Sequence, residues 1–150
     1  MDFATIFRLD ENLNLDKKTL VFLRWIAIFG QLFSVNLVYF FLDLNFPVLL
    51  CHIIIFIGFI TNIYLQLGLK ATLLKDLYST SFLMYDIVQL SVLLFLTGGI
   101  FNPFAILLIV PTIVSSTFLS MGSTIILGSS TITLLFVLTF FNMPLPGMEE

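Results

Sequence analysis

Long apolar stretches separated by short polar breaks dominate the chain. Each stretch is about 20 residues long, and the breaks carry charged residues, asparagine, glycine or proline. Because the apolar core of a bilayer takes about 20 residues of α-helix, each stretch predicts one transmembrane helix. The predicted spans are residues 19–42, 47–69, 77–96, 102–120 and 124–141. The expected fold class is all-α, a polytopic membrane bundle of about five helices.

Composition supports this interpretation and excludes several functions. Hydrophobic residues make up 59% of the 150 positions and charged residues 10%, against roughly 25% charged in soluble domains. So few charges exclude an ordinary cytosolic enzyme, and no basic run predicts a nucleic-acid partner. The single cysteine, Cys51, excludes an internal disulfide and a cysteine-based metal cage.

The basic residues predict the orientation, because cytoplasmic loops retain lysine and arginine. All six precede the second span or lie in the loop before the third: Arg8, Lys17, Lys18, Arg24, Lys70 and Lys75. This pattern places the N-terminus in the cytoplasm. We expect a cytoplasmic or interfacial segment (1–18), a transmembrane domain (19–146) and an extracytoplasmic tail (147–150). An odd number of spans indicates either a natural five-span protein or a sequence from which a sixth span is missing, and the interrupted topology favours truncation.

Four polar residues at membrane depth are candidate functional residues, because such groups are costly there. Asp86 lies near the middle of the third span, with Gln89 on the same helical stripe. It is either a proton- or ligand-linked carboxylate, or a neutral group hydrogen-bonded to a neighbouring helix or a dimer partner. Arg24 is expected to extend to the inner interface. His52 has no second ligand nearby, so neither a metal nor a haem is expected.

The loop between the third and fourth spans holds the richest local pattern. Two glycines end one helix, and an asparagine–proline pair is suited to begin the next. This turn also offers a ligand site, with free backbone N–H groups and a helix dipole facing two aromatic rings. A quinone would suit it, and an asparagine amide could bind a carbonyl or cap the helix. The candidate quinone residues are Gly98, Gly99, Phe101, Asn102, Pro103 and Phe104.

The same loop resembles the GGxxNPF signature of the RegB/PrrB-type redox-sensing histidine kinases. Residues 23–31 are similar to that family's LRWxAxxGQ stretch, and 86–97 to its third helix. Pro111 and residues 144–146 also match in order and spacing. The resemblance implies a membrane sensor domain that binds ubiquinone, in a bacterial inner membrane. It also implies a kinase domain and a response regulator in the full system, and possible homodimers.

No phosphoacceptor helix and no nucleotide-binding motif is present, so the sequence identifies no catalytic residue. Whether this chain has enzymatic activity stays open. Two other functions also remain. The first is a small transporter or channel subunit with Asp86 in an ion path, which predicts an aqueous cavity reaching Asp86. The second is a structural membrane subunit with Asp86 as a buried polar contact.

We further expect the fourth and fifth helices to form a tight antiparallel hairpin. Its small residues are Gly122, Gly128, Ser129 and Ser130.

Overall fold

The structure, a computed structural model, describes residues 15–41, 45–70 and 72–143. Within these ranges it is helical, with a single isolated β-bridge between Asp16 and Leu73. The elements are, in order, α2 (Lys17–Phe41), α3 (Val48–Gly68), α4 (Asp76–Leu96), η1 (Gly99–Phe101), η2 (Pro103–Ile109), α5 (Val110–Phe118) and α6 (Met121–Phe140). The predicted all-α membrane bundle is confirmed.

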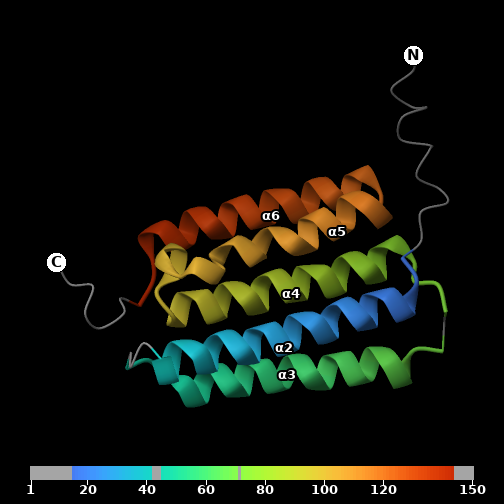
Figure 1. The fold of residues 1–150 in the computed structure, drawn as a ribbon. Helices are drawn as coiled ribbons and strands as arrows, with labels where there is room; N and C mark the ends of the chain where they lie inside the picture. Colours follow the sequence, from blue (N-terminus) through green and yellow to red (C-terminus); the bar gives the residue numbers. More distant parts are fainter. Residues whose placement is uncertain (1–14, 42–44, 71, 144–150) are drawn as a thin grey trace.

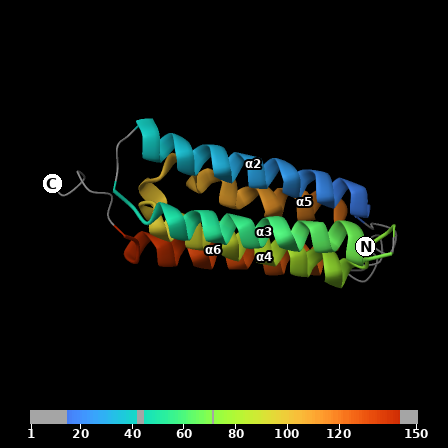
Figure 2. The ribbon, with the colours of Figure 1, turned by 90° about the horizontal axis from the view of Figure 1, so that it is seen from below.

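The helices lie side by side along a common direction (Figures 1 and 2). Helix α2 packs on α3, while α4 contacts α3 on one side and α5 and α6 on the other. Half of the most apolar stretch of α4 is buried, against 22–33% in the other three long helices. The helix that carries Asp86 is therefore the central one, and the rest of the apolar surface is left for lipid.

Four of the five predicted spans are confirmed as helices long and apolar enough to cross a membrane: α2, α3, α4 and α6. The protein is therefore a multi-pass membrane protein. The ends of these helices agree with the predicted ends to within about three residues. Most of the predicted N-terminal segment (1–18) and all of the predicted tail (147–150) lie outside the described residues.

The fourth predicted span, 102–120, differs from expectation. It is a helix of 16 residues, Pro103–Phe118, and its first seven residues are wound as the 3₁₀ helix η2. Pro111 explains this winding, because its ring would collide with the carbonyl of residue 107 in an α-helix. A 3₁₀ helix rises about 2.0 Å per residue, so η2 and α5 together still extend about 28 Å, close to the apolar thickness of a bilayer.

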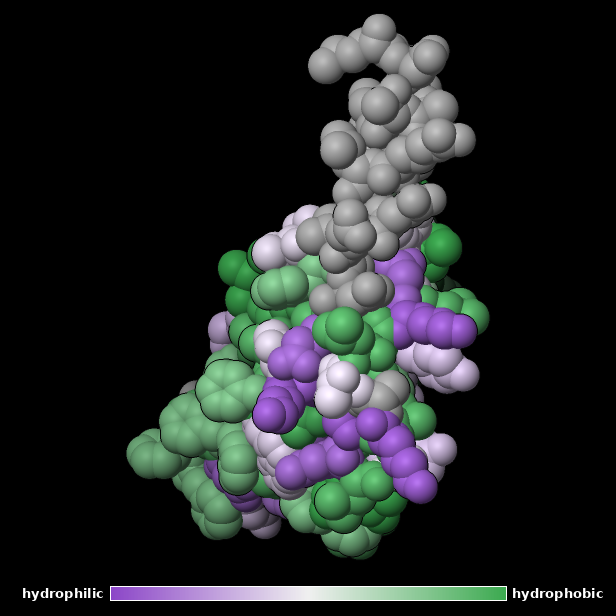
Figure 3. Space-filling model, turned by 90° about the vertical axis from the view of Figure 1, so that its right-hand side faces the viewer, coloured by the Kyte–Doolittle hydropathy of each residue, from purple (hydrophilic) through white to green (hydrophobic). Residues whose placement is uncertain are grey.

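One end of the bundle carries the described lysines. Lys17 and Lys18 begin α2, and Lys70 and Lys75 flank the connection from α3 to α4. Figure 3 views this end and shows hydrophilic side chains gathered on it. Their position at one end is what a cytoplasmic face requires, and the orientation itself stays a prediction.

The same end is held together by hydrogen bonds between helix termini. The carboxylate of Asp76, at the start of α4, accepts from Ser120 N and Ser120 Oγ, each at 2.9 Å, and from Ser123 Oγ. Ser120 is the N-cap of α6. Lys17 Nζ donates to the carbonyl oxygens of Gln66 and Leu69 at the end of α3. These contacts fix the register of α2, α3, α4 and α6 at one end.

The predicted hairpin of α5 and α6 is present, but two of its expected contact residues do not take part. Gly122 and Ser129 are exposed. The helices approach through two hydroxyl pairs, each 3.0 Å apart, Ser115 with Thr124 and Thr112 with Thr131. Gly128 faces Thr112, where an added Cβ would lie 3.5 Å from its methyl carbon. Ser130 is half-buried and bonds its own helix at Ile126 O.

Candidate functional site

The loop after α4 adopts the conformation that its glycines allow. Gly98 has φ +99° and Gly99 has φ +61°, both in the left-handed region. Asn102 then caps η2, with its Oδ1 accepting from Phe104 N at 2.9 Å. Its Nδ2 donates to the carbonyl and to the hydroxyl of Thr97, at 3.2 and 2.9 Å. Asn102 is buried and cross-links the two ends of the turn.

The free backbone donors expected at the start of the fourth span are not available. Phe104 N is capped by Asn102, Ala105 N donates to the Asn102 carbonyl at 2.9 Å, and Pro103 has no N–H. The Asn102 amide is committed to Thr97 as well. The donors expected at the start of the fourth span are thus already used, while quinone binding at this loop stays a prediction.

Space at the loop is also small. The cavity beneath it has a volume of about 30 Å³, and its walls include Thr97, Asn102 and Phe104. That is enough for about one water molecule but not for a ring. Phe101 is exposed, whereas Phe104 is half-buried. The two aromatic rings thus do not form the two walls of one pocket.

The loop is packed tightly against the end of α6. A Cβ added to Gly99 would lie 2.5 Å from the Cβ of Asn142, closer than real Cβ contacts allow. Met143 N also donates to Phe95 O at 2.9 Å. Gly99 is therefore required both by its φ angle and by the approach of the chain that follows α6.

Asn102→Ala is expected to lower the free energy of unfolding by about 1–2 kcal/mol, because it removes an N-cap and the bonds to Thr97. Urea or SDS titration followed by circular dichroism measures the change. Asn36→Ala is a matched control, since the Asn36 side chain makes a local bond to Leu32 O within α2. Equal stability of the two variants would show that the cap contributes nothing.

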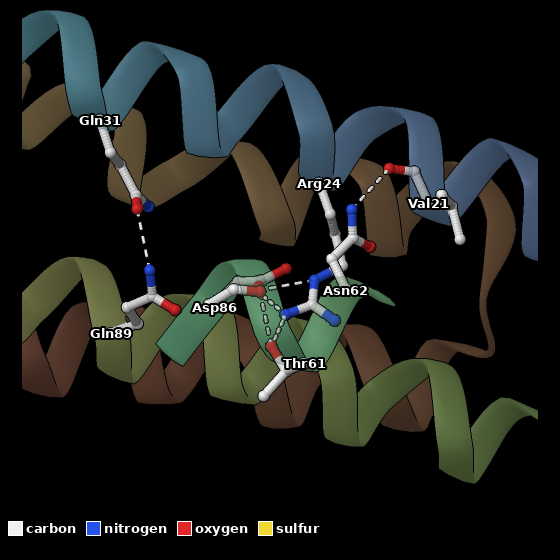
Figure 4. Close-up of polar contacts among 8 residues, drawn as sticks. Val21, Arg24, Gln31, Thr61, Asn62, Asp86 and Gln89 are labelled. Atoms are coloured by element: carbon white, nitrogen blue, oxygen red, sulfur yellow. Dashed lines mark hydrogen bonds and ion pairs between the residues drawn. The ribbon is translucent and has the colours of Figure 1, made fainter. Parts of the chain in front are cut away.

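The central polar group is an ion pair between α2 and α4 (Figure 4). Arg24 Nε and Nη2 each lie 3.1 Å from Asp86 Oδ1, and Nη2 also donates to Thr61 Oγ1 at 2.9 Å. Asp86 is ten residues from each end of α4, which spans Asp76–Leu96. Three helices thus meet at one buried polar contact near the middle of the bundle.

Arg24 does not extend to the inner interface as expected. It is 3% exposed and points inward, with its guanidinium carbon 5.1 Å from the ring centre of Phe82 and 5.6 Å from that of Tyr85. In the part of the chain that the structure describes, its Nη1 has no hydrogen-bond partner. The partner of Asp86 is therefore a cation on a neighbouring helix, and sequence reasoning missed Thr61 as the third member.

A second polar contact lies one helical turn further along α4. Gln89 Nε2 donates to Gln31 Oε1 at 2.9 Å, and both side chains are buried. Gly58 of α3 makes room for Gln89, because an added Cβ there would lie 2.6 Å from the Gln89 amide. The helical stripe of Asp86 and Gln89 faces the interior of the bundle, and Ser79 and Thr97 on the same face of α4 are buried too.

His52 is separate from these groups. It is half-buried near the start of α3, and its Nδ1 lies 2.8 Å from Val48 O. Because a carbonyl only accepts, Nδ1 carries the proton. Among the described residues, no three His, Cys, Asp or Glu side chains gather at one point. His52 is thus fixed by a local bond within α3.

One comparison with known proteins gives a strong match. The chain is 36% identical over 129 residues to the sensor histidine kinase RegB of Cereibacter sphaeroides. The chain is related to RegB. The match covers 85% of this chain and 28% of RegB, so the chain spans just over a quarter of that protein's length. No protein-family model matches the chain, and no solved structure matches it significantly.

The extent of the RegB match bears on the site residues. It leaves 15% of the 150 residues, about 22 positions, uncovered. Wherever a match of that length begins, it includes Asp86 and the loop at 98–104. The similarity to RegB therefore extends over both polar regions described above, and the predicted resemblance is confirmed.

Proposed function

We propose that this protein is the membrane sensor domain of a histidine kinase and binds a ubiquinone-type quinone from the lipid phase. The redox state of the quinone would then be reported through helix packing to a kinase domain and a response regulator of the full system. The proposed location is a bacterial inner membrane, and homodimers are compatible with the exposed apolar faces. The observation that carries the proposal is the similarity to RegB across the loop 98–104.

The chemistry of the bundle supports a neutral, lipid-soluble ligand. The loop 98–104 contains no ionisable side chain, and it lies at the membrane end opposite to the lysines. The ionic groups within the bundle compensate each other, because Arg24 pairs with Asp86. Such an interior offers hydrogen bonds and apolar walls without a net charge, which suits a quinone better than an ion.

The alternative of an ion path through Asp86 has less support. That function predicts an aqueous cavity at Asp86, but the cavity beside it is lined mainly by aliphatic side chains such as Leu20, Leu83 and Leu90. The carboxylate is also held by a guanidinium 3.1 Å away. Transport would have to break this contact in every cycle, at a cost of several kcal/mol.

Signalling requires that the ligand bind two packing states differently, since equal affinity shifts no equilibrium. Helices α2 and α4 are joined by long side chains, the Arg24–Asp86 and Gln31–Gln89 contacts. A ligand that competes for these groups would change how α2 sits on α4. We therefore expect the response to quinone to appear at this helix pair.

The single tryptophan provides a binding assay. Trp25 packs against Phe29 and Phe59, with ring centres 5.8 and 5.2 Å away, and neighbours Arg24 in sequence. Titrating a short-chain ubiquinone analogue into the protein in lipid nanodiscs is expected to quench its fluorescence along a saturating curve. A strictly linear decrease, equal to that of free tryptophan octyl ester in the same nanodiscs, would indicate partitioning alone and overturn the proposal.

A further inference from the structure

A cavity of about 270 Å³ lies between α2, α4 and the η2–α5 segment, deeper than the loop 98–104. Cavities of about 150 Å³ in protein cores accept benzene, so this one has room for a substituted six-membered ring. Ile26 and Val110 line it and are 54% and 45% exposed. Its mouth therefore opens between α2 and α5 toward the lipid, where an isoprenoid tail could leave.

The cavity exists because α2 presents small residues to it. Ala27 and Gly30 lie on the wall between Arg24 and Gln31. A Cβ added at Gly30 would have no atom within 4 Å. The two long-side-chain contacts across the gap hold α2 and α4 apart, so the space is not closed by direct helix packing.

Two polar side chains of the wall have unused hydrogen-bonding capacity. Gln31 Oε1 accepts from Gln89, while its Nε2 donates to no group in the described residues. Both contacts from Arg24 go to Oδ1 of Asp86, and within the same ranges Oδ2 accepts nothing. A donor on α2 and an acceptor on α4 are therefore available on the walls of the cavity.

We infer that this cavity, and not the loop, holds the quinone head group, with Gln31 donating to a carbonyl and Asp86 Oδ2 accepting from a hydroxyl of the reduced form. This inference rests on the proposed function and adds the location and contacts of the ligand. The two oxygens of a benzoquinone lie on opposite corners of one ring, so one side chain on α2 and one on α4 can each contact one of them. Only the quinol has a proton to donate, so Asp86 distinguishes the two redox forms.

The position also explains how the loop takes part without touching the ring. Gln31, Leu90 and Leu107 line both the large cavity and the small one beneath the loop. Asn102 fixes the start of η2, and Leu107 lies in η2. The turn therefore sets the shape of one cavity wall, and changes in the turn act on binding through that wall.

Filling the cavity tests the location. Gly30→Leu places a side chain into open space and is expected to weaken binding of the ubiquinone analogue at least tenfold in the Trp25 assay. Gly122→Leu is the matched control, because Gly122 is exposed on α6, away from the cavity. Full affinity in Gly30→Leu, with saturable binding by the unmodified protein, would overturn this location and leave the proposed function standing. Absence of saturable binding by the unmodified protein would instead overturn the proposed function.

Asp86→Asn tests the contact with the reduced form. The asparagine Oδ1 can keep the bonds from Arg24, and its Nδ2 replaces the free oxygen with a donor. The ratio of quinol to quinone affinity is expected to fall at least fivefold, because the amide can donate to a carbonyl. An unchanged ratio would overturn the role of Asp86.

Size-exclusion profiles and circular dichroism identify any variant that fails to fold. If Gly30→Leu does not fold, Gln31→Leu replaces it, and this variant is expected to weaken quinone binding at least fivefold. Full quinone affinity in Gln31→Leu would overturn the head-group site.

Discussion

Asp86→Ala is expected to lower the free energy of unfolding by about 3–5 kcal/mol, the largest effect of any single substitution proposed for this protein. The change leaves the guanidinium of Arg24 buried, with Thr61 as its remaining acceptor in the described part of the chain. An uncompensated charge in an apolar interior costs far more than the pair itself contributes. SDS titration of the protein in detergent, followed by circular dichroism, measures the difference.

The double variant Arg24→Ala/Asp86→Ala separates the pair from its surroundings. We expect it to be less destabilised than the sum of the two single variants by at least 1 kcal/mol, because it leaves neither charge unpaired. Lys18→Ala is the control for loss of a charge, since Lys18 is exposed at the start of α2. Its effect should stay within about 0.5 kcal/mol. Strict additivity of the two single variants would show that Arg24 and Asp86 do not interact.

Gly99→Ala is expected to destabilise the protein by about 3 kcal/mol, through two separate causes. Its φ of +61° strains any residue with a Cβ, and that Cβ would lie 2.5 Å from the Cβ of Asn142. The same SDS titration measures the loss. Because the loop shapes the wall at Leu107, the variant should also weaken quinone binding in the Trp25 assay.

A second substitution separates the two causes at Gly99. Asn142→Gly removes the opposing Cβ, so the pair Gly99→Ala/Asn142→Gly should recover the steric part and retain a loss of about 1–2 kcal/mol from the strained backbone. Gly122→Ala is the matched control, since its nearest neighbour would be Ser120 Oγ at 3.9 Å. A loss at Gly99 that Asn142→Gly leaves unchanged would show that the contact with the end of α6 carries no energy.

The number and limits of the long helices followed from the sequence because apolar length is a direct requirement of the bilayer. The inward face of α4 followed too, since Ser79, Asp86, Gln89, Leu93 and Thr97 follow one another at intervals of three, four or seven residues. The winding of the fourth span did not. Its average apolarity is that of an α-helix, and only the steric effect of Pro111 on the preceding turn distinguishes η2.

The polar contacts between helices could be predicted only in part from the sequence. Asp86 was identified from the sequence as a carboxylate at membrane depth, but its partner Arg24 lies 62 positions away. Arg24 is close enough to the start of its helix that its side chain was expected at the inner interface. Pairing between helices depends on their rotation, which single-helix periodicity does not define. The loop was identified correctly as a capped turn, yet the donors that seemed free are used within it.

The cavity could not be predicted from the sequence, although one signal was present. Ala27 and Gly30 follow Arg24 at three-residue intervals, so small side chains lie on the same face as the polar ones. In a membrane helix such a face usually indicates close helix packing. Here the long side chains of Arg24 and Gln31 prevent that approach, and the small residues line a space instead.

The most direct test of this account is a distance between α2 and α5 measured with and without quinone. Phe22→Cys and Ile113→Cys, at two exposed positions, carry spin labels in a Cys51→Ala background. Double electron–electron resonance in nanodiscs then gives the distance distribution without ligand, with quinone and with quinol. We predict that the quinone and quinol distributions differ, and that Gly30→Leu removes the difference. Superimposable distributions at saturating ligand would contradict the claim that this bundle senses quinone.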